Sequence, residues 1–206
     1  MQLTIFFNAP AQVSIPIQYG HLLQGLIYRQ MDNPALRNFL HEQGFALEKR
    51  RFKLFTFSRL MAEEVAYDRE AGRLVLTPPI KLMICSPIPF ILQELGTGFL
   101  RQGLVRLGAA RLEVKEMVTA APKVMQGVVR LQMLSPVVVY STLSSGDGRN
   151  YTYYYSPFEP RFIELVASNL ARKFFLVYGR PAPLEGFDIR PARVNDQDLK
   201  VTYYKE

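Results

Sequence analysis

The sequence predicts an α+β protein of two ferredoxin-like (RRM-like) domains in tandem, the second incomplete at its C-terminus. Three observations lead to this prediction. Residues 1–121 show patterns in the order strand, helix, strand, strand, helix, strand, which is the ferredoxin-like plan. A second series begins at residue 122 and stops before its second helix and fourth strand. The chain has 206 residues, 49% hydrophobic and 21% charged, which leaves room for two small folded domains.

The N-terminal domain begins with a strand followed by two helices. Residues 2–7 alternate like a half-buried strand, and apolar residues recur at helical spacing over residues 18–31. Asn33 and Pro34 are typical of the cap and first position of a second helix. Gly44 is typical of the residue that follows a helix end. The sequence therefore predicts one strand and two helices in this segment.

Strand patterns dominate the rest of the N-terminal domain. The polar segment 67–73 contains a glycine and predicts a turn. Pro87 and Pro89 predict a break before the last helix. The expected elements are strands at residues 52–60, 74–76, 82–86 and 110–118, and a helix at residues 90–103.

The C-terminal domain, residues 122–206, starts with a long β-branched segment. Residues 128–141 predict a strand, and Pro136 within it indicates a sheet edge or a bulge. The Gly, Ser and Asx residues of segment 144–150 predict a hairpin turn. The remaining expected elements are a return strand at 151–155, a helix at 160–178 that ends at Gly179, and strands at 187–194 and 199–204.

Positive charge is concentrated in the first part of the chain. The net charge is +7, and residues 1–60 contain seven Lys and Arg against three Asp and Glu. Five cations and no carboxylate occur between Lys49 and Arg59, interleaved with phenylalanines. Because phosphates attract cations and bases stack on flat rings, this run favours nucleic-acid binding over a solvated charged face. The expected RNA-binding residues are Lys49, Arg50, Arg51, Arg59 and Arg149.

Other features disfavour whole classes of protein. No apolar run reaches the roughly 18 residues that span a bilayer, and the N-terminus lacks the basic start and cleavage site of a signal peptide. Cys85 is the single cysteine, so neither an intrachain disulfide nor a thiolate metal cluster is expected. The sequence contains no metal-ligand spacing, Walker loop, GxGxxG motif or nucleophile elbow. We therefore expect a cytoplasmic protein without a membrane partner or a bound metal.

Tyr28, His41 and Lys53 form the candidate catalytic site. On a helical projection Tyr28 lies opposite the apolar half of its helix, and His41 points away from the apolar stripe of the next helix. A histidine that titrates near neutrality is the usual proton carrier in metal-free RNA cleavage. A lysine beside it can stabilise charge that builds up on a phosphate. These residue types in one basic segment therefore point to phosphate chemistry.

Each of these residues also has a purely structural explanation. Most tyrosines on helices belong to the core, and a single surface histidine is more often inert than catalytic. Lys53 could be a gatekeeper at a strand edge. His21 shares a helix face with Tyr28 and is the second-choice catalytic histidine. The tyrosine-rich strand at 151–155 could stack bases, although tyrosine is also common in strands.

Three runs of the N-terminal domain stand out together: YGHLLQGLIY at residues 19–28, FLHEQG at 39–44 and FKLFTFS at 52–58. With LSPV at 134–137 and SNL at 168–170, they closely resemble a family of CRISPR-associated endoribonucleases in the RAMP superfamily. Members of that family cut the repeat RNA of precursor CRISPR transcripts. The resemblance spans essentially the whole chain, and its N-terminal part is the most specific.

The resemblance implies two ferredoxin-like domains and RNA cleavage that needs neither a metal ion nor another cofactor. By similarity, His41 transfers a proton as acid or base, Tyr28 assists at the other end of the reaction, and Lys53 stabilises the phosphorane-like transition state. The 2′-hydroxyl of the RNA is the implied nucleophile, and the products carry a 2′,3′-cyclic phosphate and a 5′-hydroxyl. The implied partner is CRISPR repeat RNA; a CRISPR effector complex and a homodimer stay open as further assemblies.

One part of the family's pattern is missing from the sequence. Members usually carry a glycine-rich loop near the C-terminus of the second domain that helps bind RNA, whereas this sequence ends with Tyr203, Tyr204, Lys205 and Glu206. We therefore expect the second domain to be truncated before that loop, with a weaker hold on RNA. The alternative function is a non-catalytic RNA-binding subunit of a CRISPR effector complex on the same fold.

Overall fold

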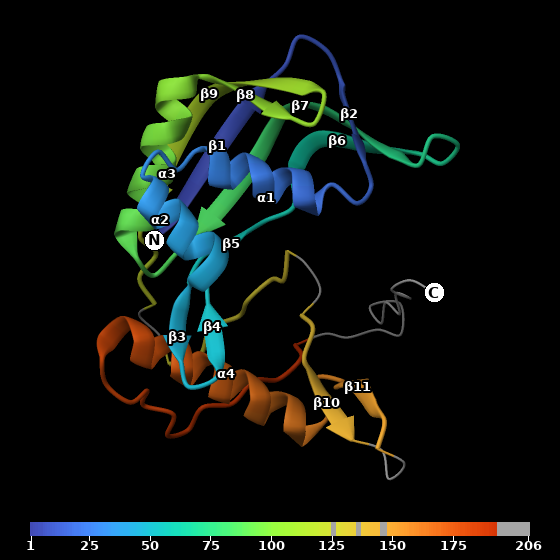
Figure 1. Ribbon diagram of the computed structural model, residues 1–206. Coiled ribbons are helices and arrows are strands. Elements are labelled where there is room, and N and C mark those ends of the chain that lie inside the picture. Colours follow the sequence, from blue (N-terminus) through green and yellow to red (C-terminus); the bar gives the residue numbers. More distant parts are fainter. Residues whose placement is uncertain (125–126, 135–136, 145–147, 193–206) are drawn as a thin grey trace. The chain divides into compact units, whose positions relative to one another are not determined.

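The computed structural model describes residues 1–124, 127–134, 137–144 and 148–192 (Figure 1). The chain divides into two units, Met1–Met125 and Gln126–Glu206. Within the described ranges, no helix is both long and apolar enough to cross a membrane.

An antiparallel sheet forms the framework of the first unit. Its strands are β1 (Gln2–Asn8), β2 (Val13–Pro16), β5 (Thr56–Phe57), β6 (Met61–Asp68), β7 (Arg73–Cys85), β8 (Leu104–Leu107) and β9 (Ala110–Ala120). Strand β1 lies between β7 and β9, while β6 pairs with β7. With one helix after β1 and another after β7, the chain follows the strand-helix-strand-strand-helix-strand order, which confirms the plan expected for this unit.

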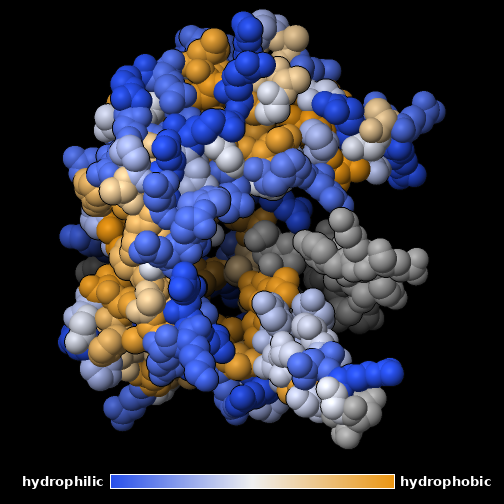
Figure 2. Space-filling model, in the orientation of Figure 1, coloured by the Kyte–Doolittle hydropathy of each residue, from blue (hydrophilic) through white to orange (hydrophobic). Residues whose placement is uncertain are grey.

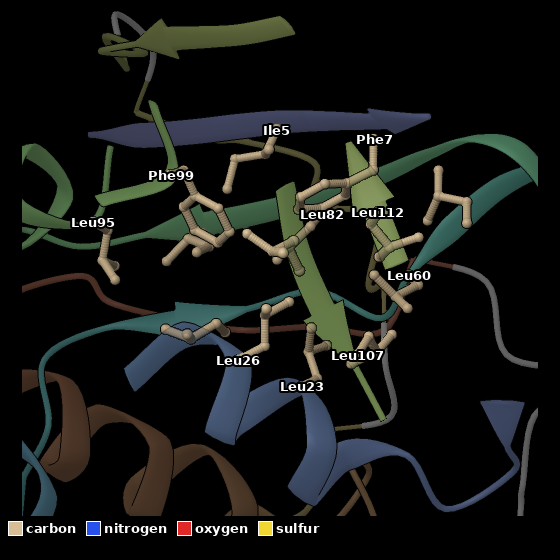
Figure 3. Packing of buried hydrophobic residues seen from close by; sticks show 14 of the residues in the cluster. Ile5, Phe7, Leu23, Leu26, Leu60, Leu82, Leu95, Phe99, Leu107 and Leu112 are labelled. Atoms are coloured by element: carbon tan, nitrogen blue, oxygen red, sulfur yellow. The ribbon is translucent and has the colours of Figure 1, made fainter. Parts of the chain in front are cut away.

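Two helices, α1 (Gly20–Arg29) and α3 (Pro89–Gln102), cover one face of this sheet. The strands turn alternate residues toward them, so Ile5 lies opposite Leu82 across the ladder between β1 and β7, and both are fully buried. The helices contribute Leu23, Leu26, Leu95 and Phe99 to the same cluster (Figure 3). Each fully buried side chain of this kind contributes about 1.5–3 kcal/mol, so this cluster holds the helices on the sheet.

Helix α3 approaches the end of α1 closely at Gly98. A Cβ on Gly98 would lie 1.9 Å from the carbonyl oxygen of Gln30, which leaves no space for any other residue. Nearby, the side-chain amide of Gln102 donates to the carbonyl of Arg29 at 3.4 Å. The contact therefore fixes the last turn of α1, which carries Tyr28.

A short helical segment and a small hairpin follow α1. Helix α2 (Pro34–Asn38) begins where predicted, because the side chain of Asn33 accepts hydrogen bonds from the main-chain N–H groups of Ala35 and Leu36. Its continuation η1 (Phe39–Gln43) is a π-helix, closed by a hydrogen bond from Gly44 N–H to the Phe39 carbonyl at 2.6 Å. The hairpin consists of β3 (Phe45–Leu47) and β4 (Arg50–Phe52).

The expected strand at 52–60 is wrong. The chain leaves β4 after Phe52, turns at Leu54 with a φ of 52°, and pairs with β7 only at Thr56 and Phe57. Phe52 and Leu54 are both buried, so the turn serves packing rather than a continuous ladder. By contrast, the two separate strands expected at 74–76 and 82–86 belong to one continuous strand, β7.

Two prolines lie inside β7, between the two runs that the sequence predicted as separate strands. Pro78 and Pro79 lie where the register between β6 and β7 shifts, between Ala62 and Glu64. Because proline has no N–H to donate, an interruption of the ladder is the place where a strand tolerates it. The two apolar runs on either side therefore belong to the same strand.

The second unit contains the hairpin β10 (Tyr140–Ser144) and β11 (Asn150–Tyr154), followed by helix α4 (Pro160–Tyr178). The predicted return strand and helix are thus confirmed. The helix ends at Gly179, which adopts a left-handed conformation with a φ of 67° and donates to the Phe175 carbonyl at 2.8 Å.

Other expectations for this unit differ from the structure. No strand occurs in 127–134 or 137–139, although β10 begins at Tyr140 within the expected strand. Val128 and Val138 are 86% and 62% exposed, so β-branched composition alone does not form a strand that has no partner ladder. The described residues 187–192 also form no strand. Residues 145–147 of the turn, Pro136 and the expected strand at 199–204 lie outside the described residues.

Candidate active site

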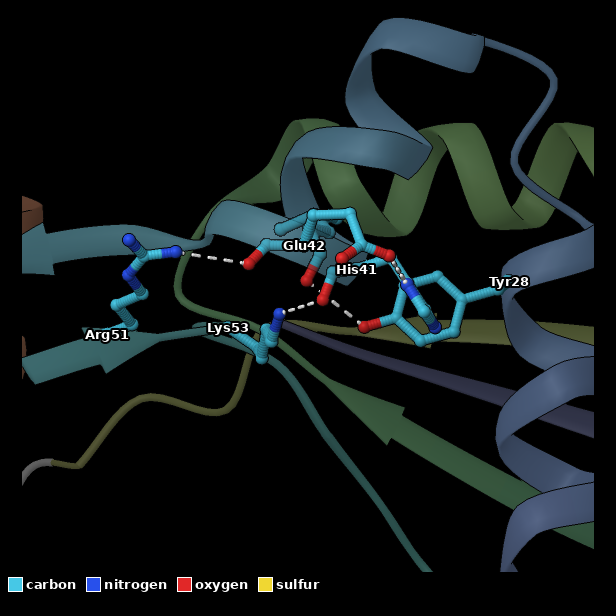
Figure 4. A network of polar contacts seen from close by, with 6 residues as sticks. Tyr28, His41, Glu42, Arg51 and Lys53 are labelled. Atoms are coloured by element: carbon cyan, nitrogen blue, oxygen red, sulfur yellow. Dashed lines mark hydrogen bonds and ion pairs between the residues drawn. The ribbon is translucent and has the colours of Figure 1, made fainter.

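The candidate site is built on the end of the π-helix η1. The last carbonyls of a helix have no partner within it, and here three consecutive carbonyls accept hydrogen bonds from three side chains (Figure 4). The Tyr28 hydroxyl donates to the Leu40 carbonyl at 3.2 Å, and the Lys53 ammonium group donates to the His41 carbonyl. The Arg51 guanidinium donates to the Glu42 carbonyl at 3.3 Å. These bonds connect α1, β4 and Lys53, the residue that follows β4, to the end of η1.

Tyr28 lies beneath His41 rather than on an open helix face. Its ring packs edge-on against the His41 imidazole, with 5.1 Å between ring centroids, and against Phe55 at 5.9 Å. Only 7% of Tyr28 is exposed, so the expectation that it lies outside the core is wrong. A single-helix projection cannot include η1 and Phe55, which cover that side.

The environment of Tyr28 keeps its hydroxyl protonated. Burial raises the pKa of the Tyr28 phenol, and a hydrogen bond with Gln24 lowers that pKa by a smaller amount. The hydroxyl is therefore a hydrogen-bond donor at neutral pH, which suits its bond to the Leu40 carbonyl.

His41 presents an accessible imidazole. Its side chain is 58% exposed, as the orientation predicted from the sequence required. The Nδ1 atom contacts the Oε1 atom of Glu42, so the carboxylate accepts the Nδ1 proton (Figure 4). This contact assigns Nδ1 as the protonated nitrogen and leaves Nε2 for proton exchange with a ligand.

Lys53 reaches η1 because Gly44 allows a close approach. Gly44 has a φ of 67°, and a Cβ there would lie 2.8 Å from the Phe52 carbonyl oxygen and 3.5 Å from Cδ of Lys53. A glycine is therefore required by both its conformation and its contacts. The structure thus brings Tyr28, His41 and Lys53 together around the end of η1.

The remaining predicted residues are more widely distributed. His21 lies in the first turn of α1, about 10 Å along the helix axis from Tyr28. Lys49 occupies the turn between β3 and β4, and Arg50 and Arg51 lie on β4, all three exposed. Figure 2 shows hydrophilic side chains over this hairpin. Arg59 is exposed between β5 and β6, and Arg149 directly precedes β11 in the second unit.

Two features of the site were not found from the sequence. Glu42 was not singled out, because neighbouring residues on a helix do not normally face each other. Arg51 was predicted only to bind RNA, whereas here it also caps a carbonyl. Within the ranges that the structure describes, no three His, Cys, Asp or Glu side chains are grouped as a metal site would require.

Comparison with protein-family models identifies both halves of the chain. A model described as "CRISPR-associated protein Cas6, N-terminal" matches residues 14–118. A second, "CRISPR associated protein Cas6, C-terminal", matches residues 119–206. A search of curated proteins found no match.

Solved structures share the fold over 89% of this chain. A "CRISPR associated protein Cas6" has 23% identity and a TM-score of 0.66, and the match covers 73% of its length. A "Cas6-related gene from Pyrococcus furiosus" has 20% identity and a TM-score of 0.72 over 73% of its length. "An RAMP protein binding different RNA substrates" has 16% identity and a TM-score of 0.64 over 74% of its length.

These likenesses confirm the tandem ferredoxin-like fold class and the resemblance found in the sequence. The two family models together account for the chain from residue 14 to its end. The chain therefore belongs to the CRISPR-associated Cas6 family, whose members generally process precursor CRISPR RNA.

Proposed function

We propose that this protein is a metal-independent endoribonuclease that cleaves CRISPR repeat RNA. One observation carries the proposal: the exposed His41 imidazole has Nδ1 held by a carboxylate and packs against the Tyr28 ring, while the Lys53 ammonium group donates to the main-chain carbonyl of the same residue. A proton carrier and a cation in contact with the same short helix are what phosphodiester cleavage requires.

The proposed reaction uses only groups of the RNA and the protein. The 2′-hydroxyl attacks the adjacent phosphorus, a 2′-oxygen–phosphorus bond forms, and the bond from phosphorus to the 5′-oxygen breaks. One proton leaves the 2′-hydroxyl and one reaches the 5′-oxygen, so the products are a 2′,3′-cyclic phosphate and a 5′-hydroxyl. Nε2 of His41 carries out one of these transfers, and solvent exchanges the other proton.

Lys53 stabilises the charge on the phosphorane-like transition state in this proposal. Its ammonium group rests on the neutral carbonyl of His41, and a phosphate oxygen is a stronger acceptor for it. In this proposal the lysine exchanges the carbonyl for a phosphate oxygen as its acceptor.

Tyr28 is assigned a positioning role. Its hydroxyl is buried and engaged by the Leu40 carbonyl, while its ring supports the His41 imidazole. A direct role at the other end of the reaction, which the family resemblance implies, would require the hydroxyl to leave that carbonyl.

Cleavage of a repeat RNA in excess EDTA tests the proposed reaction. The wild-type protein should cut the RNA, and a substrate with a 2′-deoxy nucleotide upstream of the cut should stay intact. His41→Ala should lower the rate by roughly 10²-fold or more, while His21→Ala, the matched control, should leave it unchanged. Loss of cleavage in EDTA, or equal cleavage of the deoxy substrate, contradicts the mechanism. If His41→Ala cleaves at the wild-type rate and His21→Ala is inactive, His21 rather than His41 transfers the proton.

A second candidate function is a non-catalytic RNA-binding subunit of a CRISPR effector complex. It is favoured by the capping of main-chain carbonyls by Tyr28 and Lys53, which alone accounts for their presence. This function predicts salt-dependent binding of repeat RNA with no cleavage under any condition. A cleavage gel beside a binding titration therefore separates the two functions.

A further inference from the structure

The hairpin β10–β11 has one exposed face that carries tyrosine, threonine, serine and asparagine. Register pairs Tyr140 with Tyr154, Thr142 with Thr152 and Ser144 with Asn150, so these six residues share one face. All six are exposed. In the described part of the chain the hairpin pairs with no other strand. We call this surface the tyrosine face.

The opposite face of the hairpin is engaged within its own unit. Ser141 and Leu143 are half-buried, and the Tyr153 hydroxyl donates to the Glu159 carboxylate at 3.1 Å. The rings of Tyr153 and Tyr155 pack edge to face, with centroids 4.9 Å apart. Tyr153 and Tyr155 therefore have contacts within their own unit, whereas Tyr151, on the same face, is 50% exposed. The tyrosine face has its own contacts, the ring pair of Tyr140 and Tyr154 and a hydrogen bond from the Ser144 hydroxyl to the Asn150 amide oxygen at 2.9 Å.

Tyr140 and Tyr154 form a pair of open aromatic surfaces. Their ring centroids are 5.8 Å apart with 48° between the planes, and the residues are 59% and 62% exposed. Around them lie hydroxyl and amide groups, so the surface is neither strongly hydrophilic nor hydrophobic (Figure 2). Exposed aromatic rings bordered by uncharged polar groups are typical of a recognition surface.

The chemistry of this face complements an unpaired nucleobase. A base has a flat apolar surface that stacks on tyrosine and polar edges that hydroxyl and amide groups can bind. Arg149, which directly precedes β11, places a cation on the hairpin. The chain as a whole has a net charge of +7.

We propose that the tyrosine face binds single-stranded RNA, with one or two bases stacked on Tyr140 and Tyr154. The choice of RNA over a protein partner rests on the proposed function, and the segment bound would be an unpaired part of the repeat transcript. The tyrosine face belongs to the second unit and His41 to the first, so the face is assigned binding and no step of the reaction.

The pair could also serve only to stabilise the hairpin, because cross-strand aromatic pairs contribute to sheet stability. Two double substitutions separate these roles. Tyr140→Phe with Tyr154→Phe keeps the stacking rings, whereas Tyr140→Ile with Tyr154→Ile keeps high strand propensity and removes the rings. Tyr67→Ile is the matched control, since Tyr67 is a strand tyrosine of the first unit and is 53% exposed.

The test uses the full chain carrying His41→Ala and an unstructured RNA oligonucleotide that contains 2-aminopurine. Binding should quench the 2-aminopurine fluorescence through stacking. The Phe pair should bind like the parent protein, and the Ile pair should bind roughly five- to hundred-fold more weakly. Because stacking releases no counterions, the slope of affinity against salt should be unchanged in the Ile pair. Tyr67→Ile should behave like the parent protein.

Absence of quenching in the parent protein overturns the proposal whatever the variants do. Equal RNA affinity of the Ile pair and the parent also overturns it, and leaves the tyrosine face to a protein partner. These outcomes are distinct from failure of the proposed function, which is measured by cleavage with wild-type protein. If RNA binding depends on the tyrosines but the wild-type protein does not cleave, the proposed role of the tyrosine face is supported and the nuclease function is contradicted. If the wild-type protein cleaves but binding does not depend on the tyrosines, the nuclease function is supported and the role of the tyrosine face is contradicted.

Discussion

At the scale of single residues, the candidate site depends on side chains that keep the His41 imidazole in position. Glu42 accepts the Nδ1 proton of His41, and Tyr28 supports the imidazole ring from below. Neither needs to touch RNA to affect its cleavage. Their contributions can be separated from those of His41 and Lys53 by substitutions that keep shape and remove one interaction.

Glu42→Ala should lower the cleavage rate by roughly 10- to 100-fold, because the imidazole loses the partner that fixes its tautomer. Glu42→Gln should retain most of the rate, since the amide oxygen can still accept the Nδ1 proton. Single-turnover rates on repeat RNA measure both effects. Gln43→Ala, an exposed neighbour on η1, is the control. Equal rates for Glu42→Ala and the wild type would remove Glu42 from the site.

Tyr28→Phe should reduce the free energy of unfolding by about 1–3 kcal/mol, because a carbonyl beside a buried ring loses its donor. If Tyr28 only positions His41, the cleavage rate should fall by no more than about tenfold, since the ring remains. Urea unfolding and single-turnover cleavage provide the two numbers. A loss of activity as large as that of His41→Ala would indicate that the hydroxyl takes part in the reaction.

The effect of Tyr28→Phe on the free energy of unfolding should depend on pH. Burial raises the pKa of Tyr28 in the folded state, so this group's contribution to stability is complete below the unfolded pKa of about 10 and is lost as pH rises through the higher folded pKa. The difference in unfolding free energy between wild type and Tyr28→Phe should therefore be constant near neutrality and shrink above about pH 10. Denaturant titrations across the alkaline range measure it. A difference that grows with pH would contradict the assigned environment.

At the scale of elements, the π-helix η1 and the glycine that ends it determine where the site residues lie. Gly44 turns the chain directly into β3, and its missing side chain lets Phe52 and Lys53 approach. The position is therefore constrained twice, by backbone conformation and by contact.

Gly44→Ala should cost about 1–3 kcal/mol from its positive φ and more from the contact with the Phe52 carbonyl. Gly72→Ala is a matched control, because Gly72 has a φ of 61° and nothing within 4 Å of its Cβ position. The difference between the two unfolding free energies isolates the close approach to Phe52. Cleavage should fall only in Gly44→Ala, through displacement of Lys53. Equal effects on stability and activity would show that the close approach is unimportant.

Elements with strong local signals were predictable, and elements held by tertiary pairing were not. The cap at Asn33 and Pro34 and the end of α4 at Gly179 are local features, and both were predicted at these residues. Strands β2, β3 and β8 have three or four residues, which is too short for a period to be recognised. The turn at Leu54 was missed because only the burial of the folded state explains it.

The site was predictable in composition and not in geometry. Tyr28, His41 and Lys53 were selected by residue type and position, but their meeting depends on η1 lying against α1. The burial of Tyr28 and the contact between His41 and Glu42 follow from tertiary packing and side-chain rotamers, which a helical projection does not contain.

At the scale of the whole molecule, the chain has an excess of positive charge, and part of that charge lies on the hairpin that follows the candidate site. Lys49 and Arg50 are exposed on the β3–β4 hairpin that begins directly after η1. Interactions of such cations with phosphates supply affinity that depends strongly on salt and little on sequence.

Replacing Lys49 and Arg50 together by Ala should weaken binding to all RNA sequences. The salt slope should fall by about 0.7 for each phosphate of a single strand that the variant no longer neutralises. Titrations at several salt concentrations with His41→Ala protein measure the slope. Arg111→Ala with Lys115→Ala on β9, also exposed, is the charge-matched control and should change the slope less. The opposite ranking of the two double variants would relocate the RNA path.

The three capped carbonyls of η1 have a consequence for how the site is lost. Donors from separate parts of the chain converge on three successive peptide groups, so an opening of η1 breaks all three bonds together. Local opening of η1 would release Tyr28, Arg51 and Lys53 in one cooperative event. In mild denaturant, activity should then disappear in a single step that precedes global unfolding, together with protection of the η1 amides from hydrogen exchange.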